Sequence, residues 1–290
     1  MNKTTDFPQI QDPVDIELKG INGHEFIWTS ADFDRVQSLI YQYAGINLHD
    51  GKHAMVYSRL SRRLRETGYQ SFNDYLNWLE AHDGAEWQEF VNALTTNLTS
   101  FFRENHHFEI FNDYLKCRSE KKVIRVWCSA ASTGEEPYSI LMTAIDALGS
   151  RDHLVLVASD IDSKVLATAE QGIYRLENIR NVSNSQLQKF FLRGKASNSG
   201  MIRIRPEYRE LIQFIKLNLI GRDWGFREVF DVVFCRNVMI YFDAPTQRKV
   251  LENIYKVMAP GGLLFVGHAE NFGESRDLFT LKGKTVYERR

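Results

Sequence analysis

The sequence predicts an α/β fold, in which a Rossmann-like, mainly parallel sheet follows a helical region. Three adjoining features lead to this prediction. Residues 123–128 are rich in β-branched and aromatic side chains, which is typical of a buried strand. Small residues at 130–134 predict a tight turn, and Glu135-Glu136-Pro137 then begins a segment with apolar residues at helical spacing. Strand, turn and helix open a βαβ unit, so a ligand is expected at the turn, beyond the carboxyl ends of the strands.

The turn favours a ligand without phosphate. It lacks the G-x-G-x-x-G pattern of dinucleotide sites, and the helix starts with two carboxylates, Glu135 and Glu136, which would repel a phosphate. A ligand with cationic and hydroxyl groups suits this turn better. S-adenosylmethionine meets that description and NAD does not. The alternative is that both glutamates only cap the helix.

Composition sets outer limits on function. The chain has 290 residues and a formal charge of -1, so it can hold one large domain, or one plus a small one, and has no overall field that would attract nucleic acid. We find no membrane-length apolar run and no signal-peptide pattern, and expect a cytoplasmic protein. The three cysteines lack metal-binding spacing, so we expect free thiols and no metal.

The N-terminal part is predicted to be a tail over 1–30 and a helical domain over 31–94, since apolar residues recur there at helical spacing. A helix over about 52–66 has an apolar face with Leu60 and Leu64. Its other face is basic and is either simply solvated or a docking surface for an acidic partner. That basic face comprises Lys52, Arg59, Arg62 and Arg63.

The segment 95–122 is predicted to be a linker and cofactor-contacting segment, with a helix over about 105–116. Its polar residues are candidates for helix caps. Arg103 follows two phenylalanines, and a guanidinium in such a place is suited to hold an anion.

Two further strands of the sheet end in polar residues. Asp160 ends the strand 154–159, at about the distance past the turn where an acid accepts hydrogen bonds from ribose hydroxyls. The alternative role, capping the next helix, suits Asp162 equally well. Asn237 and Tyr241 follow the strand 230–235, so we expect them at the same edge, next to the turn.

Residues 177–217 interrupt the α/β rhythm. Strands over 189–193 and 201–205 flank a polar loop, and a third strand over 211–217 is expected to rejoin the main sheet. The insert has a basic edge, which is either a decorative hairpin or a place where a peptide strand adds.

Four segments together resemble one family, the CheR chemotaxis receptor methyltransferases, and the likeness extends from the basic helix to Tyr287. These segments are 97–104, 131–139, 158–162 and 234–242. The resemblance implies a class I methyltransferase fold with an all-α N-terminal domain and a small antiparallel β-subdomain. It also implies methyl transfer from S-adenosylmethionine to glutamate side chains of bacterial chemoreceptors, giving glutamyl methyl esters and S-adenosylhomocysteine.

The resemblance also implies roles for single residues. Arg103 and Tyr241 would lie near the transferred methyl group, Asp160 would hold the ribose and Glu135 the amino-acid end. The full set of implied cofactor contacts is Asn97, Thr99, Arg103, Glu135, Asp160, Asn218, Leu219, Arg236 and Asn237.

Two surfaces gain a meaning from the same resemblance. The basic helix would face the methylation region of a receptor, and the protein would be recruited to the membrane arrays that hold these receptors. The insert would bind the pentapeptide at the C-terminus of some receptors. The residues implied for the peptide are Arg193, Gly194, Gly200, Arg203 and Arg205.

Two other classes of function compete with this reading. A nucleic-acid methyltransferase would need a broad basic surface and base-stacking aromatics, and the sequence indicates neither. A degenerate methyltransferase fold that only binds the cofactor or docks partners would show binding without transfer.

Overall fold

The computed structural model describes residues 25–118, 123–179, 181–272 and 275–290. Within this part of the chain, seven strands form one sheet in the order β6-β2-β1-β7-β8-β10-β9. The first five pair in parallel, whereas β10 is antiparallel to β8 and β9. The bounds are β1 Ile124–Cys128, β2 Leu154–Asp160, β6 Ile212–Lys216, β7 Phe230–Cys235, β8 Met258–Val266, β9 Phe279–Gly283 and β10 Val286–Arg289.

Helices cover both faces of this sheet, as the α/β prediction requires. Helices α5 (His106–Cys117) and α6 (Glu135–Leu148) pack against one face, where Val126, Ala158 and Phe234 are buried. Helix α10 (Ala244–Val257) covers the other face. Because strand residues alternate between the faces, each central strand contributes to both cores. Helix α7 (Ser163–Gln171) follows β2.

Within the described residues of 95–122, the expectation of a linker is wrong, while the expectation of cofactor contacts stays a prediction. Phe101, Phe102 and the buried face of α5, which includes Phe108 and Phe111, belong to the main hydrophobic core beneath α6. The aromatic residues that follow the polar stretch bury too much apolar surface to remain in a linker. Residues 119–122 lie outside the described part of the chain.

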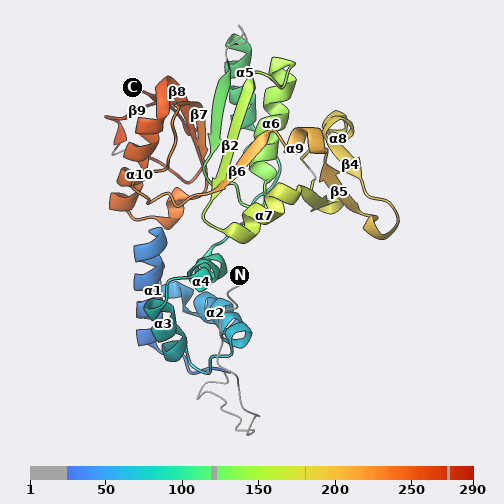
Figure 1. Cartoon of the computed structure of the whole chain (residues 1–290). Helices are drawn as coiled ribbons and strands as arrows, with labels where there is room; N and C mark the ends of the chain where they lie inside the picture. The colour runs from blue at the N-terminus through green and yellow to red at the C-terminus, as the bar shows by residue number, and fades with distance from the viewer. Residues whose placement is uncertain (1–24, 119–122, 180, 273–274) are drawn as a thin grey trace.

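Helices α1–α4 form a helical domain with its own core, which lies beneath the sheet domain in Figure 1. The predicted tail over 1–30 is wrong at its end. Phe26 is buried, and Trp28 packs with its ring centroid 4.5 Å from that of Phe72, so the helical core begins before α1. Residues 1–24 lie outside the described part. The bounds are α1 Ser30–Ala44, α2 His53–Thr67, α3 Phe72–Ala81 and α4 Ala85–Leu94.

The small antiparallel insert is present, but its bounds differ from the predicted 177–217. In the described residues its sheet has the order β3-β5-β4, and it therefore begins with β3 (Ile173–Arg175), directly after α7. Strand β6 pairs in parallel with β2, so the expected return to the main sheet is confirmed. Figure 1 shows the insert protruding beside α6 and α7. Its other elements are α8 Asn184–Phe190, β4 Phe191–Arg193, β5 Met201–Ile204 and α9 Pro206–Arg209.

Candidate functional site

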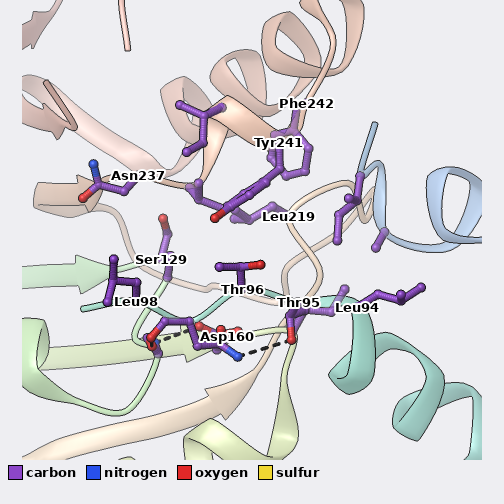
Figure 2. Close-up of a pocket in the computed structure, with 18 of the residues that line it drawn as sticks. Leu94, Thr95, Thr96, Leu98, Ser129, Asp160, Leu219, Asn237, Tyr241 and Phe242 are labelled. Atoms are coloured by element: carbon purple, nitrogen blue, oxygen red, sulfur yellow. Dashed lines mark hydrogen bonds between the residues drawn. The ribbon is translucent and has the colours of Figure 1, made fainter. Parts of the chain in front are cut away.

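A cavity of about 320 Å³ opens at the carboxyl edge of the sheet. Its floor is formed by residues that directly follow β1, β2, β6 and β7, which confirms the expected place of the site. The helical domain closes another side with residues between Ala44 and Met55 and with Leu94. Figure 2 shows Asn237, Leu219 and Tyr241 on one side of the cavity and Asp160, Thr95 and Leu98 on the other.

Asp160 lies on the cavity wall and is held in place by the backbone. Its carboxylate accepts hydrogen bonds from the N–H of Ser132 at 2.8 Å and of Asp162 at 3.0 Å. Burial raises the pKa of Asp160 to about 6, although these backbone donors stabilise the charged form. The two open roles are now separated, because Asp162 accepts from the N–H groups of Lys164 and Val165 and caps α7.

An acid–base cluster lies beside the turn and combines residues from three separate segments. The Arg236 guanidinium donates to the Glu136 carboxylate at 2.7 Å and lies 3.2 Å from the Glu104 carboxylate, and its side chain is fully buried. Burial raises the pKa of Glu136, and Arg236 opposes that shift. Glu136 and Arg236 both line the cavity. A carboxylate beside a guanidinium suits the ammonium and carboxylate groups of an amino-acid ligand.

Glu135, which the resemblance implies for the amino-acid end of the cofactor, stands beside this cluster in the first turn of α6. Its carboxylate accepts from the Thr133 hydroxyl at 2.6 Å, and the carboxylate on the cavity wall is that of Glu136. Both glutamates lie in the first turn of α6, so the part of Glu135 in binding stays a prediction.

The polar segment before α5 lines the cavity with Asn97, Thr99 and Arg103. Asn97 donates to the Asp162 carboxylate at 2.8 Å, and its carbonyl accepts from the Ser132 hydroxyl at 3.0 Å. Arg103 donates to the Leu98 carbonyl at 2.9 Å and is partly exposed. The segment is therefore bound to the turn, while Arg103 retains access to the cavity.

The opposite wall joins the two domains. Asn218 donates to the Tyr43 carbonyl at 2.6 Å, and the N–H of Asn47 donates to the Tyr241 carbonyl at 2.8 Å. Leu219 is buried on the same wall. The helical domain thus holds the backbone of Tyr241. No sequence pattern indicated the part that residues 46–49 play here, because it depends on contacts between domains.

The basic face predicted for α2 is corrected in two positions. Arg59 donates to the carbonyls of Leu94 and Thr95 at 3.0 and 2.6 Å, so its guanidinium binds the backbone at the end of α4. Arg63 is 11% exposed in its side chain and pairs with Glu86. The sequence could not show that α4 brings a carboxylate and free carbonyls to this face.

The remaining cations of that face are accessible. The Arg62 side chain is 76% exposed and pairs with Glu66 one turn along the helix. Lys52 lies at the start of α2 and lines the cavity.

The insert presents a mixed apolar and basic face. Arg203 pairs in register with Ile173 on one side and Leu192 on the other, and all three are exposed. Arg193 and Gly200, whose φ is +85°, flank the loop between β4 and β5. Arg205 instead donates to the Gln188 carbonyl at 3.2 Å, and Gly194 lies within the fold against Asn198.

In the described ranges, no group of three or more His, Cys, Asp or Glu side chains could hold a metal ion. None of the helices in those ranges is both long and apolar enough to cross a bilayer.

Comparisons with known proteins agree with this geometry. Residues 97–287 match the family model "CheR methyltransferase, SAM binding domain", and residues 31–95 match "CheR methyltransferase, all-alpha domain". A chemotaxis protein methyltransferase of Escherichia coli is 50% identical over 262 residues, covering 89% of this chain and 91% of the relative. Its counterpart in Klebsiella aerogenes is 52% identical, covering 89% of both chains. Chemotaxis protein methyltransferase 2 of Pseudomonas aeruginosa is 48% identical, covering 91% and 94%.

The expected fold and cofactor are thereby confirmed: a class I methyltransferase sheet, an all-α domain and a site for S-adenosylmethionine. The cavity suits that cofactor, with a carboxylate for a diol and a carboxylate–guanidinium pair for an amino-acid group. This chain belongs to the CheR methyltransferase family.

Proposed function

We propose that the protein methylates glutamate side chains of bacterial chemoreceptors, giving glutamyl methyl esters. The observation that supports this most is a cavity with cofactor-type groups at its base that is also lined by a cation of the helical domain, Lys52. An acidic side chain from another protein fits such an entrance. The names of the relatives, chemotaxis protein methyltransferases, favour the same substrate class.

The chemistry asks little of the protein beyond positioning. When bound, S-adenosylmethionine supplies an electrophilic methyl group on a sulfonium, which becomes a neutral thioether as the new O–CH₃ bond forms. A carboxylate is already ionised at neutral pH, so no general base is required. Holding its oxygen in line with the methyl group accounts for much of the rate. Charge disappears in the transition state, so apolar wall residues such as Leu219 and Phe242 do not oppose the reaction.

Arg103 and Tyr241 are the groups we assign to orient the acceptor. Both line the cavity, and Arg103 is partly exposed. A tight ion pair with Arg103 would stabilise the ground-state carboxylate more than the transition state, where the charge is fading. The hydrogen bond from Arg103 to the Leu98 carbonyl leaves the guanidinium able to orient the acceptor carboxylate without enclosing it. We assign Tyr241 to a hydrogen bond with the carboxylate oxygen that does not react.

The cofactor would be held by residues on opposite walls of the cavity. Asp160 would accept hydrogen bonds from the ribose diol, and Glu135 would bind the amino-acid end beside the pair of Glu136 and Arg236. We retain the other proposed contacts, all of which line the cavity: Asn97, Thr99, Arg103, Asn218, Leu219 and Asn237.

Receptor binding would use two surfaces. Arg62 and Lys52 would contact the acidic methylation region, whereas Arg59 and Arg63 serve the helical domain itself. The exposed row of Ile173, Arg203 and Leu192 suits a peptide with aromatic and acidic side chains, and this is where we place the receptor pentapeptide. Such a tether raises the local substrate concentration without changing the active site.

The test is incubation of the full chain with methyl-labelled S-adenosylmethionine and receptor-containing membranes. Label on the receptor that is released by mild base identifies an ester, since N-methyl groups survive base. A receptor with its candidate glutamates changed to alanine is the control. Label on nucleic acid would contradict the proposal, and so would tight binding of S-adenosylhomocysteine without any transfer to receptor.

A further inference from the structure

A buried carboxylate outside the cavity holds the loop that carries two of the proposed site residues. Glu270 is 3% exposed and follows β8. One carboxylate oxygen accepts from the N–H of Met239 at 2.8 Å. The other accepts from the N–H groups of Asn237, at 2.9 Å, and Gly267. A single side chain therefore satisfies backbone donors from two separate segments.

The loop needs such support because its backbone is not regular. Asn237 has a φ of +57°, in the left-handed region that costs a non-glycine residue about 1 kcal/mol or more. Met239 begins the 3₁₀ turn η4 (Met239–Tyr241), whose first N–H groups have no partner inside the turn. The carboxylate of Glu270 lies at the positive end of this turn, where a negative charge is favoured.

The second segment is shaped to fit the same contact. A Cβ on Gly267 would lie 2.4 Å from the side-chain amide nitrogen of Asn237 and 2.8 Å from a carboxylate oxygen of Glu270. Only glycine fits there without displacing Asn237. Asn237 is further held from the other side by Glu104, which accepts from its side-chain amide at 3.3 Å.

We propose that Glu270 is a positioning residue for methyl transfer: through the backbone of Asn237 and Met239 it sets where Asn237 and Tyr241 stand in the cavity. The inference rests on the proposed function, in which Asn237 contacts the cofactor and Tyr241 orients the acceptor. It assigns to Glu270 a part that neither the motifs nor the cavity lining assigns, because its side chain does not reach the cavity.

The substitution Glu270→Gln keeps the size of the side chain but removes its ability to accept hydrogen bonds through both oxygens. A glutamine has one accepting oxygen, so its NH₂ group must face the N–H of Met239 or the N–H pair of Asn237 and Gly267. A donor facing a donor pushes the loop out of place. Displacement by about 1 Å costs about 100-fold in rate. Gly267→Ala perturbs the same contact from the other segment and should give the same kinetic pattern.

The matched control is Asp231→Asn. Asp231 is also buried, at 4% exposure, and accepts a backbone hydrogen bond from Arg125 at 2.9 Å, but it lies near the start of β7, away from the cavity. All variants are measured well below their unfolding temperatures. Calorimetry gives the Kd for S-adenosylhomocysteine, and transfer to receptor gives kcat and the receptor KM.

We expect Glu270→Gln and Gly267→Ala to raise the Kd for S-adenosylhomocysteine and to lower kcat, each by about tenfold or more. The KM for the receptor should be unchanged. Asp231→Asn should lower only the unfolding temperature. Loss of stability by Glu270→Gln with Kd and kcat within twofold of the unmodified protein would overturn the inference. If Glu270→Gln does not fold, Gly267→Ala decides by the same criteria.

Two parallel variants separate this inference from the proposed function. Asn237→Ala and Tyr241→Phe remove the groups that Glu270 is proposed to position. If these two impair binding or turnover and Glu270→Gln does not, only the positioning role fails. If all three are without effect while receptor is still methylated, the assignment of the site itself fails.

Discussion

Removal of the Arg63 charge, as in Arg63→Met, is expected to destabilise the helical domain by about 3 kcal/mol without a direct effect on receptor binding. Arg63 donates to Glu86 through Nε at 3.0 Å and through a second nitrogen, and the side chains of both residues are 11% exposed. Tyr75, which is fully buried, also donates to Glu86 at 2.8 Å. Methionine retains the apolar stem, so the change isolates the charge.

The magnitude follows from what is left behind. Without the guanidinium, the Glu86 carboxylate stays buried with one neutral donor, and breaking a buried pair by removing one partner costs about 3–5 kcal/mol. We take the lower end because the pair keeps some contact with solvent. For a domain of this size, about 3 kcal/mol corresponds to a fall in Tm of roughly 12–24 °C.

The matched comparison is Arg62→Ala. Its side chain is 76% exposed and pairs only along the helix with Glu66, so we expect a loss of less than about 0.5 kcal/mol. Receptor KM should rise for Arg62→Ala and not for Arg63→Met.

Urea unfolding followed by tryptophan fluorescence measures the first effect, since Trp78 and Trp87 belong to the helical domain. Equal stability losses in the two variants would refute the reasoning. A rise in receptor KM caused by Arg63→Met alone would refute it too.

Three further predictions concern the cavity and the insert. Burial raises the pKa of Asp160 from 3.8 to about 6, so the uncomplexed protein protonates this carboxylate more readily than the unfolded chain does. If the ionised form binds the ribose, the Kd for S-adenosylhomocysteine should be constant above about pH 7 and rise roughly tenfold per unit below about pH 6. The same burial makes the free energy of unfolding fall as the pH rises from 3.8 to about 6. Asp160→Asn should remove the pH dependence of both the Kd and the stability. A Kd of the unmodified protein that calorimetry finds to be constant across this pH range would contradict the assignment. Tyr241→Phe should lower kcat roughly tenfold, as expected for loss of one hydrogen bond to a charged group, with a smaller change in cofactor Kd; equal losses would reduce Tyr241 to a binding residue. An aromatic and acidic pentapeptide should bind the insert in calorimetry, and Arg203→Ala should weaken it; no binding at high micromolar peptide would argue against a tether.

Some features followed from the sequence because short-range patterns determine them. The β-branched run before the small-residue turn could only be buried in a sheet, and the helix beginning at Glu135 follows from its apolar spacing and Pro137. Asp160 was placed correctly because parallel strands all end at one edge. Asp162 caps α7 through contacts within three residues of itself.

Other features depended on residues that the chain brings together from far away. Whether Arg63 faces a receptor or an acid of its own domain was decided by Glu86, which lies 23 residues further along the chain. The ion pair that holds Glu136 on the cavity wall depended on Arg236, which lies 100 residues further along the chain. The wall between Ala44 and Met55 exists only because the helical domain packs on the sheet edge. A local pattern fixes which side chains a helix or turn can present, but tertiary packing decides what each one meets, because burial makes every charge find a partner.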